Sequence, residues 1–544
     1  MKDFKDKVIY QIYPKSFKDT NGSGTGDLRG IVEKLDYLAG LGVDYLWLTP
    51  FFKSPQNDNG YDVENYYEID PAYGTMEDLE ELIAKAKEKN IYLMLDMVFN
   101  HTSTEHEWFK KALAGDSYYK DFYFFRENQG KIPTNWESKF GGPAWEYVEE
   151  MDEYYLHLFD KSQADLNWEN PEVRKELIKV LNFWLEKGIR GFRFDVINLI
   201  SKDKFEDDFE GDGRRFYTDG KKVLEYLQEL NKNSFGKYDN VLTVGEMSST
   251  SIENCIKYTK PENKALDMAF NFHHLKVDYE NGEKWSDMPV NFEEFKDLLE
   301  DWQLGMEKGN GWNALFLNCH DQPRSVSRFG DDKDYRKESA KMLATLIHMQ
   351  EGTPYIYQGE EIGMTNNYFT DIGDYRDVET INYYHILKNK NVDEDKIRKI
   401  IQAKSRDNAR SPMQWTKSGG FTKGIAWIKE NPNKKEINVE DNINDQDSIY
   451  NYYKKLIEIR KKYRVISHGS YERVLKNIKN IYAFKRKYEN QTVLVINNLT
   501  KEEINIDINE MQNSKLVISN YGQREIKESL DLKAYESIVL YKEG

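Results

Sequence analysis

Acidic and basic side chains gather at the ends of four β-like runs in this sequence. The runs end in the strings DMVFNH (96–101), RFD (193–195), GE (245–246) and NCHD (318–321). A single acid at such a place could simply cap the next helix. Capping does not explain four polar clusters in corresponding positions, because strand ends meet at one face of a parallel barrel. The pattern therefore predicts an active site in which carboxylates do the chemistry.

A parallel barrel is what the rest of the sequence predicts around these clusters. Eight β-like runs alternate with helical patterns, at residues 8–13, 45–48, 91–98, 191–196, 241–245, 268–272, 314–317 and 353–357. Helix start signals support the alternation. Thr75 and Asp78 have the spacing of a capping box, and Asn170 precedes Pro171 as N-cap before an N1 proline. This order is typical of an α/β fold of the (β/α)8 TIM-barrel type.

Two segments depart from a plain barrel. Residues 101–170 separate the third strand from its helix, are rich in aromatic, glycine and turn residues, and contain PTNWESKFGGPAW. An insertion of this size in a βα loop is typical of a subdomain over the active site. After residue 463, short runs such as NIYAFKRKY and TVLVINN predict a C-terminal antiparallel β-sandwich. We expect a catalytic barrel at 1–100 and 171–463, an inserted subdomain at 101–170 and a sandwich at 464–544.

The amino-acid composition restricts which binding partners and which cellular location we expect for this protein. The 544 residues include 94 acidic and 77 basic ones, a formal net charge of −17. This excess argues against nucleic acid or an anionic membrane as the main partner, and it would repel a phosphorylated ligand unless a local basic pocket received it. No apolar run approaches the roughly 20 residues that span a bilayer. The N-terminal MKDFKDKVIYQIYP runs almost directly into a strand, and two cysteines occur. We expect no secretory signal, no disulfide framework, a cytoplasmic location and a monomer.

The four strings resemble the signature regions of the α-amylase family, glycoside hydrolase family 13. The resemblance covers nearly the whole chain, including the insertion and the sandwich, and it implies retaining cleavage of an α-glucosidic bond. Carried over onto the matching positions, Asp195 is the nucleophile, Glu246 the general acid/base and Asp321 the carboxylate that stabilises the transition state. The residues that the resemblance implies around the bound glucose are Asp62 in NGYD, His101, Arg193, His320 and Arg406 in SRDNAR.

Elementary chemistry agrees with these roles. An oxocarbenium-like transition state needs one carboxylate at the anomeric carbon and an acid for the leaving oxygen. Arg193 lies two residues before Asp195, so on a strand both side chains share a face and the cation keeps the nucleophile ionised. Glu246 needs a raised pKa, which repulsion from Asp195 and Asp321 would supply. Retention also predicts that the carboxyls of Asp195 and Glu246 lie about 5–5.5 Å apart.

Other strings in the sequence indicate which class of substrate we expect. QADLN (163–167) and Val196 resemble the family members that act on α-1,6 linkages, which argues against starch. PTNWESKFGG, GEMSST and FNFHHLKVDYENGEKW resemble the members that hydrolyse α,α-trehalose 6-phosphate. The last string offers His273, Lys276 and Lys284, which are donors of the kind that a phosphate group requires. We therefore expect a phosphorylated disaccharide as substrate, with solvated lysines and a core histidine as the alternative interpretation of this segment.

A glycine-rich loop near the N-terminus has the alternating oxygen ligands found in calcium sites. Its oxygen-bearing residues are Asp19, Asn21, Ser23, Thr25 and Asp27. Related enzymes carry a stronger acid where Ser23 stands, so the resemblance implies a weakened affinity. We expect no organic cofactor. The sequence supports two interpretations of this loop: a site for a structural Ca²⁺ or Mg²⁺, or a simple glycine-rich loop without a metal ion.

Three rival functions stand beside hydrolysis of a phosphorylated disaccharide. An oligo-1,6-glucosidase acting on isomaltose and short isomalto-oligosaccharides would share every catalytic residue, so only the basic loop separates the two. A transglycosylating isomerase of the same fold would differ in whether water or a sugar attacks. An inactive subunit of a membrane transporter is disfavoured by the three carboxylates and by the absence of an apolar anchor segment.

Overall fold

In the computed structural model, which describes residues 4–508, 511 and 514–544, eight parallel strands form the central sheet. Their order is β13-β12-β11-β5-β2-β1-β15-β14, and Ala269 next to Asn313 joins the two ends into a barrel. The strands are β1 (Ile9–Ile12), β2 (Tyr45–Leu48), β5 (Tyr92–Met97), β11 (Gly191–Phe194), β12 (Leu242–Glu246), β13 (Met268–Phe270), β14 (Ala314–Leu315) and β15 (Thr353–Tyr357). All eight predicted runs are confirmed as barrel strands. Their nearly continuous apolar sequences follow from burial on both faces.

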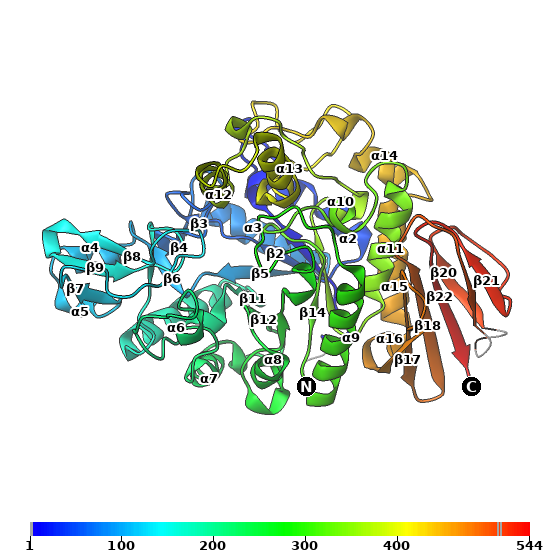
Figure 1. Ribbon diagram of the computed structural model, residues 1–544, viewed down its shortest axis with the longest axis horizontal. Coiled ribbons are helices and arrows are strands. Elements are labelled where there is room, and N and C mark those ends of the chain that lie inside the picture. Colours follow the sequence, from blue (N-terminus) through cyan, green and yellow to red (C-terminus); the bar gives the residue numbers. More distant parts are fainter. Residues whose placement is uncertain (1–3, 509–510, 512–513) are drawn as a thin grey trace.

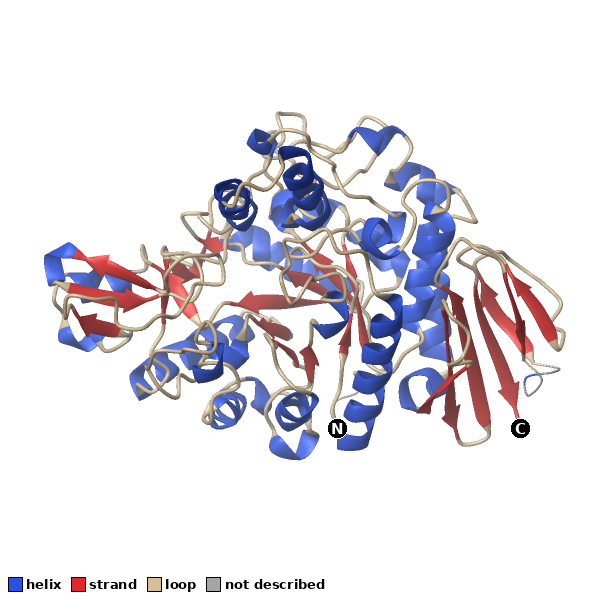
Figure 2. Ribbon diagram, viewed as in Figure 1, coloured by secondary structure: helices blue, strands red, loops and turns tan. Residues whose placement is uncertain are grey.

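Helices surround the barrel and follow the strands in sequence (Figure 2). They are α1 (Leu28–Glu33) and α2 (Leu35–Leu41) after β1, α3 (Met76–Glu88) after β2, α6 (Pro171–Glu186) after β5, α7 (Val223–Asn233) after β11, α8 (Ile252–Thr259) after β12, α9 (Phe292–Gly309) after β13, α10 (Ser325–Phe329) and α11 (Arg336–His348) after β14, and α15 (Ile449–Lys462) after β15. The predicted start signals are confirmed. Thr75 and Asp78 form a reciprocal capping box, and Asn170 caps α6 through the backbone N–H of Glu172.

The insertion after β5 projects from one end of the molecule, at the left in Figure 1. Its elements are β6 (His101–Ser103), α4 (Glu107–Leu113), α5 (Ser117–Lys120), β7 (Phe125–Glu127), β8 (Trp145–Val148), β9 (Glu153–Leu156) and β10 (Gln163–Asp165). Strands β6 and β10 pair antiparallel at its base, with His101 opposite Asp165. Lys202, which follows β11, lies 2.7 Å from Asp165 and ties this base to the barrel. The boundaries at residues 101 and 170 remain predictions.

Further elements outside the regular barrel shape its open end. The short strands β3 (Phe52–Lys53) and β4 (Asn65–Ile69) follow β2, and α12 (Val378–Asn389), α13 (Glu394–Lys404) and α14 (Val439–Asn444) lie between β15 and α15. Figure 1 shows α12 and α13 together above the barrel. The sequence patterns did not predict these helices, and Arg406 lies two residues beyond the end of α13.

The C-terminal part is a sandwich of two antiparallel sheets, as predicted. After α16 (Arg464–His468), its strands are β16 (Ser470–Val474), β17 (Ile481–Tyr488), β18 (Gln491–Asn498), β19 (Ile504–Asp507), β20 (Lys515–Ser519), β21 (Ser529–Leu532) and β22 (Ser537–Glu543). The larger sheet has the order β16-β17-β18-β22-β20, and β19 pairs with β21. Alternate residues divide the larger sheet between two cores. Leu494 and Ile496 face the smaller sheet, while Val493 and Val495 join the core shared with the barrel.

None of the described helices combines the length and the apolar composition needed to cross a membrane.

Candidate active site

One guanidinium holds the two carboxyls that the sequence assigned to bond cleavage. Arg193 lies on β11, Asp195 follows the end of that strand, and Glu246 ends the neighbouring strand β12. Arg193 Nη1 lies 2.6 Å from Asp195 Oδ1 and 2.6 Å from Asp96 Oδ1. Its other terminal nitrogen, Nη2, contacts Glu246 Oε2. Adjacent parallel strands therefore bring the expected nucleophile and the expected acid to one cation.

The environment separates the proton affinities of the three carboxyls. Burial raises the pKa of Asp195 to about 6, against the lowering effect of Arg193. Burial raises the pKa of Glu246 to about 7, and repulsion from Asp195 and Asp321 adds to the effect. Burial also favours the neutral form of Asp321, but His320, Arg406 and Arg410 hold its pKa well below the usual range. Near neutral pH this order leaves Asp195 and Asp321 ionised while Glu246 can carry a proton.

Two neutral histidines flank the carboxyls. Burial lowers the pKa of His101 to about 4, and its Nε2 lies 3.1 Å from the carbonyl oxygen of Tyr61. His320 accepts a hydrogen bond at Nδ1 from the Gln11 amide (2.8 Å), which places the ring proton on Nε2, 3.0 Å from Asp321 Oδ2. Burial lowers the pKa of His320 as well. His101 therefore reaches the cavity as a neutral hydrogen-bonding group, and His320 steadies Asp321.

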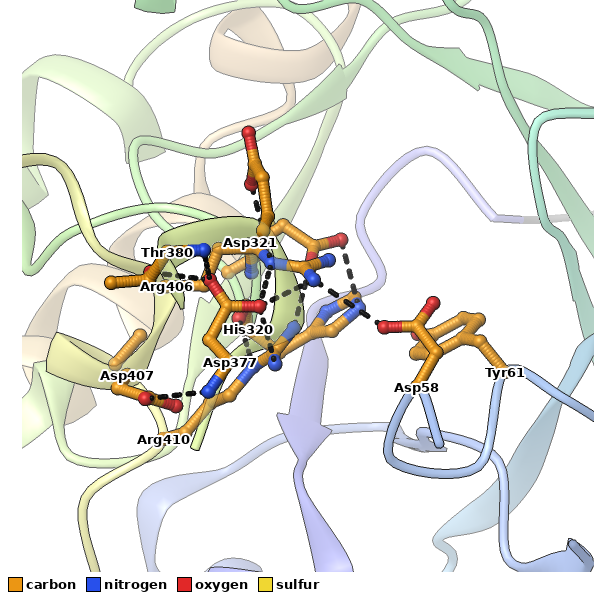
Figure 3. A network of polar contacts seen from close by, with 12 residues as sticks. Asp58, Tyr61, His320, Asp321, Asp377, Thr380, Arg406, Asp407 and Arg410 are labelled. Carbon is orange, nitrogen blue, oxygen red and sulfur yellow. Dashed lines mark hydrogen bonds and ion pairs between the residues drawn. The ribbon is translucent and has the colours of Figure 1, made fainter. Parts of the chain in front are cut away.

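A second cationic network holds Asp321 from the side of α13 (Figure 3). Arg406 Nη1 lies 3.2 Å from Asp321 Oδ1, and Arg410 Nη2 lies 2.9 Å from the same oxygen. Arg406 Nη2 also contacts Asp377 Oδ1 at 2.5 Å and Asp58 Oδ1 at 3.3 Å. Attraction to these acids keeps the pKa of Arg406 well above its usual value, although burial opposes it. The network fixes the third carboxylate in its ionised form.

The structure corrects the placement of Asp62. Its side chain is 0% exposed, and its oxygens accept hydrogen bonds from the Ser54 hydroxyl and from the backbone N–H groups of Asn57 and Asp58. Through these bonds, Asp62 stabilises the loop that carries Asp58. It is Asp58 that lines the cavity and contacts Arg406. The sequence alone could not distinguish Asp58 from Asp62, because both acids lie in the short string DNGYD.

The cavity itself is bounded by acids, cations and aromatic rings. Asp195, Glu246, Asp321, His101 and Arg406 line it together with Asp58, Phe140, Phe159, Gln163, Phe272 and Tyr279. Arg193 and His320 lie behind the carboxyls, with side chains 2% and 1% exposed. Val196, next to the nucleophile, lines the cavity with a φ of +33°. A β-branched residue rarely adopts this backbone region, and such strain is typical of functional sites.

The predicted phosphate-binding residues lie at different places around the cavity. Lys276 and Lys284 line it, and Lys284 Nζ is 2.6 Å from Glu379 Oε2. His273 stacks on Trp302 at 5.3 Å and its Nε2 lies 2.8 Å from the carbonyl oxygen of Thr250. His273 is not among the described residues that line the cavity. Its role stays a prediction.

A cation that the sequence analysis did not name also lines the cavity. Lys139 comes from the insertion, and its Nζ lies 3.3 Å from Ser248 Oγ, two residues after Glu246. It belongs to the string PTNWESKFGG, so the sequence did carry a signal. Only the fold shows that this lysine points into the site.

Comparison with known proteins settles the family. A model described as the alpha amylase catalytic domain matches residues 11–469. The chain belongs to the α-amylase family, glycoside hydrolase family 13. A model of the alpha-amylase SusG C-terminal domain matches residues 481–539, within the sandwich.

Several relatives of this family 13 chain have named activities. The trehalose-6-phosphate hydrolase of Bacillus subtilis is 56% identical over 98% of this chain and 97% of its own length. That of Escherichia coli is 51% identical, with 98% of each chain covered. An oligo-1,6-glucosidase of Bacillus cereus is 48% identical, again over 98% of both. The crystal structure of Bacillus licheniformis trehalose-6-phosphate hydrolase matches with a TM-score of 0.94 at 55% identity, covering 99% of both chains.

This family 13 protein is therefore an enzyme, a glycoside hydrolase acting on a small carbohydrate. Its relatives are named glycoside hydrolases, and the three carboxylates of the expected mechanism meet in one cavity. The interpretation as an inactive transporter subunit is wrong.

The N-terminal loop forms a closed set of hydrogen bonds. Asp19 accepts bonds from the backbone N–H groups of Asn21, Gly22 and Gly24 and from the Thr422 hydroxyl. Asp27 caps α1 through the N–H of Gly30, and the Ser23 hydroxyl bonds to the backbone of Thr25. These oxygens already have partners, so they fit a hydrogen-bonded loop better than a cation cage. A metal ion here stays a prediction, and no catalytic role is assigned to it.

Proposed function

We propose that this enzyme hydrolyses α,α-trehalose 6-phosphate to glucose and glucose 6-phosphate with retention of configuration. The observation that carries the proposal is the set of lysines around the catalytic cavity. Lys139, Lys276 and Lys284 line it in a chain whose formal net charge is −17. A phosphate group needs such a local cluster of donors, whereas a neutral disaccharide does not. The names of the relatives at 56% and 51% identity support the same substrate.

The reaction would run in two steps. The Asp195 carboxylate attacks C1 of the unphosphorylated glucose while Glu246 donates its proton to the bridging oxygen, and glucose 6-phosphate leaves. A water molecule then gives a proton to Glu246 and attacks C1, the bond to Asp195 breaks, and glucose is released. Two inversions at C1 give net retention. Asp321 remains ionised throughout and stabilises the positive charge that develops on the sugar ring.

Product analysis tests this proposal. With trehalose 6-phosphate as substrate, we expect equimolar glucose and glucose 6-phosphate, with α-glucose as the first anomer seen by rapid NMR. Appearance of β-glucose first would contradict the double displacement. If isomaltose is cleaved efficiently while trehalose 6-phosphate is not, the enzyme is an oligo-1,6-glucosidase, the activity of its 48% identical relative.

A further inference from the structure

Two lysines that line the cavity differ from its other cations in their partners. Arg406 is paired with Asp377, Asp58 and Asp321, and Lys284 is paired with Glu379. Among the residues that the structure describes, neither Lys139 nor Lys276 forms an ion pair with an acidic side chain. They come from separate parts of the chain, the insertion and the segment after β13, and both line the same cavity, close enough for Lys276 to repel Lys139.

Burial makes this arrangement costly in the free enzyme. Burial lowers the pKa of Lys139 to about 7, and repulsion from Arg214 and Lys276 acts in the same direction, against attraction from Asp212 and Glu246. The pKa of Lys276 is also lowered, by burial first and then by Arg214. Arg214 itself is paired with Asp212 at 2.7 Å. A desolvated ammonium group without an anion is unfavourable, and an incoming dianion would relieve both groups together.

We propose that Lys139 and Lys276 form the subsite that binds the 6-phosphate group, with Lys284 retained by Glu379. This inference rests on the proposed function and specifies its phosphate site. Its location agrees with the reaction, because Lys139 contacts Ser248 and Ser248 lies two residues after the acid Glu246. The leaving glucose 6-phosphate must therefore place its phosphate on the same side as the proton donor.

The subsite also provides a basis for selectivity. A neutral second sugar would leave both ammonium groups buried without an ion-pair partner, whereas a phosphate dianion supplies charge and acceptor oxygens at once. The two lysines would thus attract the phosphate group. Their burial without an ion-pair partner would make binding of a neutral sugar less favourable.

The experiment replaces each lysine with methionine, which keeps its length and removes its charge. For Lys139→Met and Lys276→Met we expect the ratio of kcat/KM on trehalose 6-phosphate to kcat/KM on a neutral aryl α-glucoside to fall by ~10–100-fold, the usual range for a lost charge-assisted contact. The inhibition constant of glucose 6-phosphate should rise in parallel. Lys131→Met is the matched control, because Lys131 is an exposed lysine of the same insertion, and it should leave the ratio unchanged. Lys139→Arg keeps the charge and should restore most of the preference.

The outcomes separate the two proposals. If the wild-type enzyme shows no preference for the phosphorylated substrate, the proposed function fails. If the wild type prefers it and both methionine variants keep that preference, the substrate stands and this subsite is wrong. A loss confined to Lys284→Met would assign the phosphate to the lysine beside Glu379 instead.

Discussion

At the scale of single residues, Arg193 contacts both carboxyls to which the proposed mechanism assigns bond cleavage. Its two terminal nitrogens contact Asp195 and Glu246, and Asp96 shares one of them. Burial raises the pKa of each catalytic carboxyl and the guanidinium lowers it, while repulsion from Asp195 and Asp321 leaves Glu246 the weaker acid. The pair can therefore keep one proton on Glu246 and none on Asp195 close to neutral pH.

We expect kcat/KM to have a bell-shaped dependence on pH. It should rise as the pH increases through about 6, where Asp195 loses its proton. It should fall through about 7, where Glu246 loses the proton that it donates. The measurement uses isomaltose, a neutral substrate, so that titration of a phosphate group does not contribute.

Glu246→Gln provides the control for this profile. The amide cannot donate a proton, so the alkaline limb should disappear and kcat/KM should fall by ~10³-fold, within the range of general acid catalysis. An alkaline limb that survives in this variant would assign the upper pKa to another group.

The sequence predicted the residues of the chemical step and missed some of those around it. Asp195, Glu246 and Asp321 lie at or beyond the carboxyl ends of barrel strands, so their meeting point follows from the barrel itself. Asp58 and Lys139 lie in loops whose course depends on tertiary contacts. The bonds that bury Asp62 and turn Asp58 toward Arg406 form only in the folded loop.

At the scale of elements, the start of α12 connects helix capping to the active site. The Asp377 side chain caps α12 through the N–H and hydroxyl of Thr380, and its other oxygen contacts Arg406. The side chain is 0% exposed. Strand runs were predictable because they are apolar on both faces, whereas the sequence of α12, VETINYYHILKN, has no clear apolar stripe.

We expect Asp377→Ala to lower the free energy of unfolding by about 2–4 kcal/mol, because the buried Arg406 loses the nearest of its acidic partners and a helix loses its cap. Urea unfolding of the variant and the wild type measures the difference. The matched control is Asp393→Ala, since Asp393 caps the neighbouring helix α13 through Lys396 on the exposed surface. Loss of that cap alone should lower the free energy of unfolding by about 1 kcal/mol. Equal losses in the two variants would show that the Arg406 contact adds nothing.

At the scale of the whole molecule, the barrel and the sandwich share one hydrophobic core. Tyr482, Phe484, Val493 and Val495 of the larger sheet belong to the same buried cluster as the barrel residues. Across this boundary, Arg486 of β17 lies 3.0 Å from Glu351, which follows the barrel helix α11. The sandwich therefore acts as a structural extension of the barrel.

Thermal unfolding should follow from this shared core. We expect a single calorimetric transition for the full chain, because exposing the sandwich would also expose part of the barrel core. Scanning calorimetry, with near-ultraviolet circular dichroism as a second probe, checks this expectation. Two resolved transitions would show that the sandwich unfolds independently.

The most direct test of the central claim compares kcat/KM for trehalose 6-phosphate and isomaltose at equal enzyme concentration and ionic strength. The proposed function predicts a preference of at least ~100-fold for the phosphorylated substrate, equivalent to about 2.7 kcal/mol in the transition state. An equal rate or a preference for isomaltose would contradict it. The family, the barrel and the carboxylate chemistry would then stand, and the lysines around the cavity would need another explanation.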